Sequence, residues 1–402
     1  MPRIIRAVKP FLFISLCVTL LLSIIGLSNA QRQKRNGSPD RPNTQWQGRD
    51  GARRGQGNKQ NGANIEANAD QIITDMMREQ HVPGVALAIV RNGQVVLKKG
   101  YGEKSLDSHD APDEDTVFNI GSLSKAITAV GAMVLVDDGK LNLDDAASKY
   151  IKDLPPSWRR ITVRQFMTHT SGIPELSNNV KKKLNTIHDA FEIAADKPFE
   201  FQPGTKQHYN NFNFAVTGRL IEVISGMNYM DFMRERVFHP LGMNQTGGGG
   251  DLASVSEDHA SGYVFTNGRL QPGVFDIQPF GWPSGGLYTT LSDLLKLEQA
   301  LRTGTLLKPA TFRQMIEKNS VGSGTPGWFA KKAAGVMLIS KNGAGKMGFS
   351  SYFLFVPERG DALILLRTNI GGIARPTAQL TEKCLGIQVR GDGDSGEDDG
   401  AQ

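Results

Sequence analysis

Two apolar hairpin patterns at opposite ends of the chain constrain its fold more than any other sequence feature. Within residues 84–97, two aliphatic runs flank Asn92-Gly93, a dipeptide typical of tight hairpin turns. Within residues 352–366, two further apolar runs flank a turn that contains Pro and Gly. From about residue 122 to 300, apolar residues recur mostly at helical spacing. The sequence therefore predicts an α+β fold, in which N- and C-terminal segments form one antiparallel sheet flanked by helices and the middle forms a mostly helical inserted lobe.

The first thirty residues have the pattern of an export signal. Three basic residues precede an apolar stretch, and Ser28-Asn29-Ala30 supplies small residues for cleavage. We expect residues 1–30 to be a signal peptide, or an uncleaved anchor that tethers the protein to a membrane through residues 10–27, because the stretch lies between the lengths of the two. Either reading predicts an exported protein, periplasmic or secreted.

Charge separates the chain into a folded body and two tails. The net charge of +6 combines +3 in residues 1–30, +6 in residues 31–62, −5 in residues 391–402 and only +2 in residues 63–390. Residues 31–62 contain almost no aliphatic side chains, so we expect a disordered basic linker there and an acidic disordered tail over 391–402. A nearly neutral domain over 63–390 argues against nucleic-acid binding, whereas the basic linker is suited to contact anionic envelope components.

Neither a disulfide nor a metal site is expected. After removal of residues 1–30 only Cys384 remains, and the seven histidines show no metal-ligand spacing with one another or with this thiol. The chemistry that the motifs suggest needs no cofactor.

The most specific candidate for chemistry is a Ser-x-x-Lys motif at the start of a helical pattern. There Ser122 and Lys125 lie three residues apart on one helix face. A serine hydroxyl becomes a good nucleophile when a partly desolvated lysine with a lowered pKa takes its proton. The free N–H groups of the first helical turn point at incoming negative charge. The alternative is a capped helix with a solvated lysine, which this motif alone does not exclude.

Two further motifs supply groups that an acyl-transfer site needs. Tyr209 and Asn211 combine a phenol that can relay a proton with an amide that can orient a substrate carbonyl or the lysine. A Lys-x-Gly pattern occurs twice near the C-terminal strands, at Lys341 and at Lys346, where a glycine after a cation lets the backbone approach a substrate. We favour Lys341, because the apolar run 336–339 leads into it as a strand.

Together these motifs resemble those of the serine β-lactamase and penicillin-binding-protein superfamily, for which Ser-x-x-Lys with a later Lys-x-Gly partner is a signature. The likeness is greatest to the class C β-lactamase-like branch of D-peptidases, esterases and β-lactamases. It runs from about residue 72 to 371. It also rests on longer stretches at residues 142–145, 161–172, 240–243 and 284–288.

The resemblance implies three catalytic side chains. Ser122 would be the acylated nucleophile, and Lys125 and Tyr209 the groups that transfer its proton. Which of the two is the general base stays open, since they can titrate as a coupled pair.

Four further residues are implied in substrate binding. Asn211, Lys341 and Gly343 would contact the substrate, and the backbone N–H groups of Ser122 and Ala344 would hold the oxyanion. A departure from the β-lactamases proper is Asn342, which stands where those enzymes often have a hydroxyl that helps to hold a substrate carboxylate. This difference weakens a dedicated antibiotic-resistance function and leaves esterase or peptidase activity open.

We therefore expect an exported serine hydrolase that acts through an acyl-enzyme on Ser122. Its substrate would be a small molecule or peptide with an ester, amide or lactam bond, as for a carboxylesterase, a D-Ala-type carboxypeptidase or a β-lactamase. The alternative is a non-catalytic envelope-binding protein that uses the same fold to bind peptidoglycan peptides or a partner. Fold and catalytic set alone do not choose the substrate, because loop shape decides it.

Overall fold

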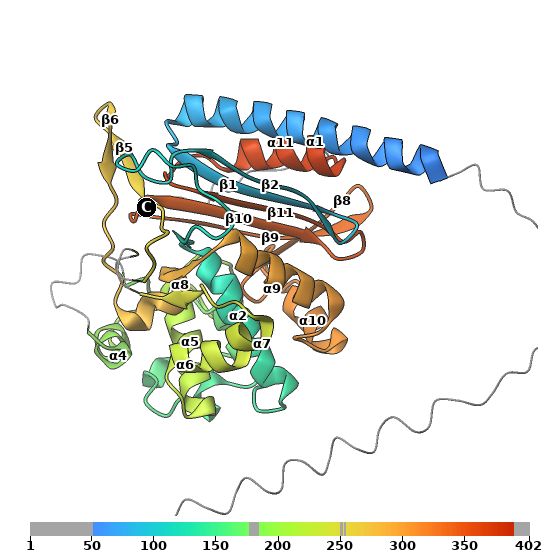
Figure 1. Cartoon of the computed structure of the whole chain (residues 1–402). Helices are drawn as coiled ribbons and strands as arrows, with labels where there is room; N and C mark the ends of the chain where they lie inside the picture. The colour runs from blue at the N-terminus through green and yellow to red at the C-terminus, as the bar shows by residue number, and fades with distance from the viewer. Residues whose placement is uncertain (1–50, 177–184, 250–251, 253–254, 390–402) are drawn as a thin grey trace, which may run out of the picture. The chain divides into compact units, whose positions relative to one another are not determined.

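An antiparallel sheet is the main feature of the computed structural model, which describes residues 51–176, 185–249, 252 and 255–389. The order of its strands is β2-β1-β11-β10-β9-β8 (Figure 1). Strands from the two ends of the chain meet inside this sheet, where Val85 on β1 lies opposite Arg367 on β11. The strands are β1 (Gly84–Arg91), β2 (Gln94–Gly102), β8 (Phe329–Ala333), β9 (Val336–Gly345), β10 (Phe349–Val356) and β11 (Asp361–Arg367).

Both faces of the central strands are buried. On β11, Leu363 and Leu365 pack with α1 (Gly51–Gln80) and α11 (Ala374–Leu385), whereas Leu366 packs with the helices on the opposite face. Figure 1 shows α1 and α11 together over one face of the sheet and the helical lobe against the other. Burial on both faces explains why β1 and β11 are continuous apolar runs rather than alternating ones.

The lobe between the two halves of the sheet is mostly helical, as expected. The α+β prediction, with one antiparallel sheet from both ends of the chain, is confirmed. The helices of the lobe are α2 (Leu123–Asp137), α3 (Val163–Met167), α4 (Ile187–Ala195), α5 (Phe212–Ser225), α6 (Tyr229–Met233), α7 (His239–Leu241), α8 (Trp282–Gly285), α9 (Leu291–Thr303) and α10 (Pro309–Ile316).

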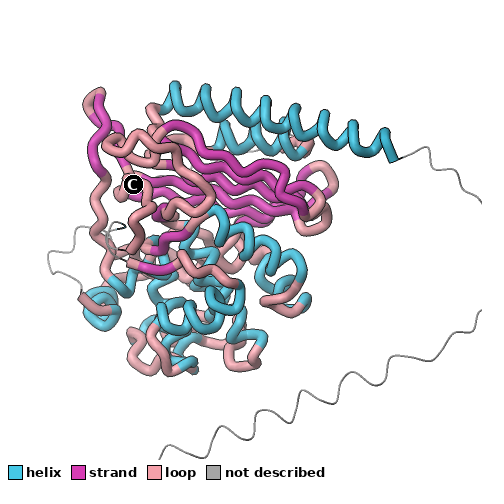
Figure 2. The backbone as a smooth tube through the Cα atoms, in the orientation of Figure 1, coloured by secondary structure: helices cyan, strands magenta, loops and turns pink. Residues whose placement is uncertain are grey.

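Short strands between residues 118 and 289 were not expected (Figure 2). A small sheet has the order β3-β7-β4, and β5 pairs with β6 in a hairpin. The hairpin turns at Asn267-Gly268, where φ is 50° and 78°, much as it is 52° and 73° at Asn92-Gly93. The same Asn-Gly signal was therefore present in the sequence but was not used. These strands are β3 (Phe118–Asn119), β4 (Gly247–Gly248), β5 (Tyr263–Thr266), β6 (Arg269–Pro272) and β7 (Leu287–Thr289).

The linker expected over residues 31–62 overlaps the start of a helix. Helix α1 begins at Gly51, so the disorder predicted for residues 51–62 is wrong. The later part of α1 is anchored to the sheet by Ile73 and Met76, and a helix with such a nucleus extends at little further cost. The predicted export segment, the earlier part of the linker and the acidic tail lie outside the described residues. Within the part of the chain that the structure describes, no helix is long and apolar enough to cross a membrane.

We predict that Leu365→Ala destabilises the protein by ~2–5 kcal/mol, because it opens a cavity where a fully buried strand packs under two helices. Val95→Ala is the matched control on an exposed position of β2, where the side chain keeps 48% of its exposed area, and should change stability by less than about 0.5 kcal/mol. Urea unfolding of the two variants measures the difference. An equal loss of unfolding free energy in the two variants would contradict the assignment of Leu365 to the core.

Candidate active site

Ser122 stands at a sharp junction between a strand and a helix. Strand β3 ends at Asn119, whose side-chain oxygen accepts a hydrogen bond from the Gly121 N–H at 2.9 Å. Gly121 has φ 49°, and a Cβ there would lie 2.9 Å from the backbone nitrogen of Ala344. Only glycine fits such a conformation and such a close approach. Ser122 follows as the N-cap of α2, with its side chain free of any capping bond.

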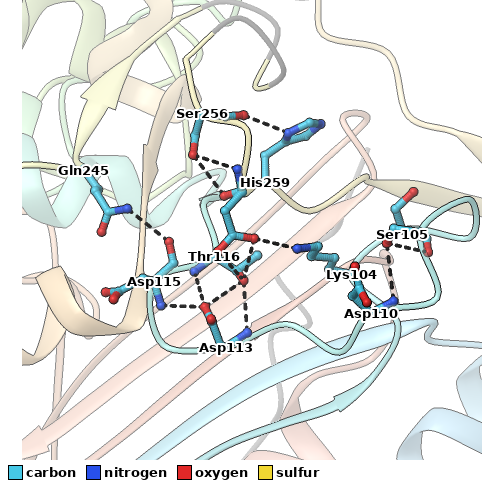
Figure 3. Close-up of polar contacts among 11 residues, drawn as sticks. Lys104, Ser105, Asp110, Asp113, Asp115, Thr116, Gln245, Ser256 and His259 are labelled. Atoms are coloured by element: carbon cyan, nitrogen blue, oxygen red, sulfur yellow. Dashed lines mark hydrogen bonds and ion pairs between the residues drawn. The ribbon is translucent and has the colours of Figure 1, made fainter.

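A polar network holds the segment that leads to this junction (Figure 3). Asp258 accepts hydrogen bonds from Lys104 Nζ at 2.8 Å and from Thr116 Oγ1 at 3.2 Å. Its backbone carbonyl accepts from the Val117 N–H at 3.0 Å. Because Val117 directly precedes β3, these contacts fix the strand that presents Ser122.

Lys125 is fully buried and joins three elements. Its Nζ lies 3.0 Å from Ser122 Oγ, 2.9 Å from Asn211 Oδ1 and 2.6 Å from the carbonyl oxygen of Ser284. The last two atoms can only accept hydrogen bonds. A neutral lysine has two N–H donors, which these two acceptors use, so its lone pair then faces the hydroxyl of Ser122. Burial holds the pKa of Lys125 well below its ordinary value and the Lys341 charge lowers it further, while Glu175 opposes them.

Tyr209 completes the contacts of the serine. Its hydroxyl oxygen lies 2.5 Å from Ser122 Oγ. Two lysine nitrogens lie near its ring, Lys125 Nζ at 4.7 Å and Lys341 Nζ at 5.2 Å from the centroid. The phenol thus lies between the serine and two lysines, a position that suits a group that moves protons.

Strand β9 forms the other wall of the site. It carries Lys341, which is 3% exposed and has its Nζ 4.5 Å from the centre of the Phe329 ring. Two residues further along, a Cβ on Gly343 would lie 2.0 Å from the Ile120 carbonyl oxygen, so the strand passes directly against the serine junction. Lys346 is exposed in the turn after β9. The structure therefore brings Lys341, and not Lys346, to the serine.

Ala344 and Asn211 also lie where the sequence analysis placed them. The backbone of Ala344 packs beside Gly121, the residue before the serine. Asn211 is exposed, and it reaches Lys125 through its side-chain oxygen. All seven candidate side chains or amides thus come together around the junction of β3, α2 and β9.

Ser284 and His169 belong to the surroundings of the site, although no catalytic motif pointed to them. Ser284 contributes only a backbone carbonyl, which no side-chain pattern reveals. His169 adopts φ 57°, and its ring centre lies 4.7 Å from that of Tyr209. Its Nδ1 accepts from the Asn210 N–H at 3.3 Å, and burial holds the pKa of His169 well below its ordinary value. A neutral imidazole thus packs against the phenol.

Glu175 was also missed. Its Oε2 accepts the Asn211 N–H at 2.8 Å, at the start of α5. Asn211 is the N-cap of that helix but makes no side-chain capping bond, because its side-chain oxygen faces Lys125. The carboxylate of Glu175 therefore takes over the capping role from outside the helix. Burial raises the pKa of Glu175, while the Asn211 N–H and the Lys125 charge lower it.

The arrangement is suited to nucleophilic chemistry at a carbonyl group. A hydroxyl touches two groups that can take its proton, and backbone amides lie beside it where negative charge would develop. Among the described residues, no group of three or more His, Cys, Asp or Glu side chains is arranged to hold a metal ion.

The chain is similar to known proteins in sequence and in fold. The model of the family described as Beta-lactamase matches residues 69–377. The chain is 26% identical over 319 residues to "Protein flp" of Staphylococcus aureus and 27% identical over 311 residues to "Putative penicillin-binding protein PbpX" of Bacillus subtilis. These matches cover 74% and 76% of this chain.

A solved structure is also similar. The octameric penicillin-binding protein homologue from Pyrococcus abyssi has a TM-score of 0.69 and 26% identity, with 79% of this chain and 76% of that chain covered. The matched region spans 62% of the length of the Staphylococcus protein and 75% of the Bacillus protein.

We predict that Lys125→Met changes the pH dependence of stability. The unfolded chain binds a proton at this lysine below about pH 10.5, whereas the lowered pKa in the folded protein shifts protonation to a lower pH. Folding of the wild type is therefore penalised as the pH falls, by up to about 1.4 kcal/mol per pH unit. The free energy of unfolding of the variant, relative to wild type, should rise between pH 9 and pH 7 in urea titrations. If the difference in unfolding free energy between variant and wild type did not change with pH, the lowered pKa of Lys125 would be contradicted.

Proposed function

Because this chain belongs to the Beta-lactamase family, whose members are generally serine hydrolases, we propose that it hydrolyses its substrate through an acyl-enzyme on Ser122. One observation carries the proposal. Ser122 Oγ lies within hydrogen-bond distance of both Lys125 Nζ and Tyr209 Oη, and the Ala344 amide lies beside the same junction. These are the nucleophile, the proton acceptors and the anion-binding group that acyl transfer requires.

In the proposed first step Ser122 Oγ attacks the carbonyl carbon of the substrate and its proton moves to a base. The contacts favour Lys125 as that base, since its two N–H bonds serve Asn211 and Ser284 and its lone pair faces the hydroxyl. Tyr209, at 2.5 Å from Ser122 Oγ, is placed to pass a proton on to the leaving group. Water then attacks the carbonyl carbon of the acyl-enzyme. Lys125 and Tyr209 transfer the protons of this step in the opposite direction, and Ser122 leaves with its proton restored.

The tetrahedral intermediate would be stabilised by the N–H groups of Ser122 and Ala344. Ser122 stands at the N-terminus of α2, where the helix dipole also favours negative charge. Within the described residues, the Ser122 N–H makes no backbone hydrogen bond. Lys341, on the wall opposite the lobe, would supply a cation for the substrate, and Asn211 would orient it.

Candidate substrates contain an ester, amide or lactam bond, as for a carboxylesterase, a D-Ala-type carboxypeptidase or a β-lactamase. The similarity to penicillin-binding proteins supports a substrate of peptide or β-lactam type. Asn342, in place of a hydroxyl, favours esterase or peptidase activity over a dedicated β-lactamase.

We also propose that the protein is exported, with residues 1–30 as signal peptide or membrane anchor. The basic residues after that segment would then face anionic envelope components. Both proposals rest on the sequence alone.

Ser122→Ala should abolish turnover, with a loss of at least about 10³-fold, because the nucleophile is removed. The full chain and the variant are tested on a short-chain aryl ester, a chromogenic cephalosporin and a D-alanyl peptide, and the preferred substrate identifies the activity. Ser157→Ala, at an exposed serine of the lobe, is the control and should retain full activity. Binding of the D-alanyl peptide without acylation of Ser122, seen by mass spectrometry, would favour the binding-protein alternative.

Gly343→Ala should lower kcat by about 10²–10³-fold, the effect of losing one oxyanion-hole donor. The added methyl would meet the Ile120 carbonyl and push β9, with Ala344, away from Ser122. Gly372→Ala is the matched control, because a Cβ there meets no atom within 4 Å. Unchanged kcat in Gly343→Ala, measured on the preferred substrate, would exclude this strand from the oxyanion hole.

A further inference from the structure

We infer that Glu175 forms a subsite for a positively charged nitrogen on the acyl part of the substrate, which makes acyl groups with a free amine the preferred class. The inference rests on the proposed function, whose substrate class it narrows. Neither the three motifs nor the comparisons point to this residue.

Only one oxygen of the Glu175 carboxylate is engaged. Oε2 accepts the Asn211 N–H at 2.8 Å, whereas Oε1 has no hydrogen-bond partner among the described residues. Oε1 is also not among the buried polar atoms without a partner, so it remains open to solvent or to a ligand. The bond to Asn211 fixes the carboxylate in one orientation, which lowers the entropic cost of binding a ligand through the second oxygen.

The negative charge of Glu175 has no ion-pair partner in the described part of the chain. The neighbouring carboxylate differs in this respect, because both oxygens of Glu200 are used. Its Oε1 accepts the Glu175 N–H at 3.1 Å and its Oε2 contacts His208 Nδ1 at 2.6 Å. A half-buried carboxylate with no cation in ion-pair contact is unfavourable, and a cationic ligand in direct contact would relieve that cost.

The position of Glu175 relative to Ser122 limits where the cation can be. Asn211 bridges the two, because its N–H bonds Glu175 and its side-chain oxygen bonds the same Lys125 amine that contacts Ser122 Oγ. The carboxylate is thus one residue away from the group proposed to orient the acyl chain. A nitrogen close to the reacting carbonyl, as in an α-aminoacyl group, suits this distance better than one at the end of a long chain.

Opposite charges also stand on opposite walls of the site. Lys341 belongs to β9, whereas Glu175 lies on the lobe beside α5. Glu175 would repel a negatively charged substrate group. It would therefore also discriminate against acyl groups that carry a carboxylate at that position.

The test compares two acyl groups of nearly equal shape that differ in charge. D-Alanyl and isobutyryl groups are offered as 4-nitroanilides and as methyl esters to the full chain. We expect kcat/KM to favour the D-alanyl compounds by about 10–100-fold, the range for one charge-assisted hydrogen bond. In Glu175→Gln, which keeps an acceptor for Asn211, the preference should fall below about threefold, because D-alanyl turnover falls more than isobutyryl turnover.

Glu358→Gln is the matched control. It removes the same charge from an exposed turn between β10 and β11 and should keep the wild-type preference. If Glu175→Gln lowered kcat/KM equally for both acyl groups, the inference would be overturned, since this would show that Glu175 only positions Asn211. Equal turnover of both acyl groups by the wild type would also overturn it.

A binding measurement separates this inference from the proposed function. D-Alaninamide and isobutyramide are titrated into Ser122→Ala by calorimetry, with and without Glu175→Gln. Tighter binding of the charged amide that depends on Glu175 supports the subsite even if no substrate is turned over, a result that would count only against the hydrolase. No preference in binding overturns the subsite even where hydrolysis by Ser122 is observed.

Discussion

The candidate site depends on one buried amine. Lys125 has no exposed surface, and its nitrogen contacts α2 through Ser122, α5 through Asn211 and α8 through the Ser284 carbonyl. Burying an amine costs free energy unless its donors are satisfied, so three helices must meet at the right distances before the lysine can be accommodated. The same contacts that satisfy the lysine direct its remaining electron pair to the serine. Stability of the lobe and reactivity of the site are thus set by one group of hydrogen bonds.

A second constraint is the close passage of β9 against the serine junction. Gly121 and Gly343 lack side chains where the two backbones meet, and even one methyl group would separate them. The sheet and the lobe therefore contribute different parts. In the proposed mechanism the lobe supplies the nucleophile and its proton acceptors, and the sheet supplies a cation and an amide. Chemistry requires both, which explains why the motifs lie so far apart in the sequence.

How much of this could be predicted depends on whether a feature is local. The Asn92-Gly93 turn, the spacing of Ser122 and Lys125 and the strand that leads into Lys341 are local patterns, and the structure has each of them. Glu175 acts through a contact with Asn211 that forms only in the folded chain, so no local pattern marks it. Composition alone predicts too late a start for α1, because a helix anchored by its later residues extends into a segment with few aliphatic side chains.

The pairing of β1 with β11 has a consequence for how the protein is made. Gly84 and Thr368 are joined by a hydrogen bond across 284 residues of sequence, and β11 lies inside the sheet rather than at its edge. Strand β1 leaves the ribosome long before β11 and gains this neighbour only when β11 has been made. Such long-range pairing folds slowly and leaves one edge of the apolar strand β1 unpaired in the meantime, although β2 pairs with its other edge. A nascent chain of this protein would therefore expose one open edge of β1 to other chains until β11 is available.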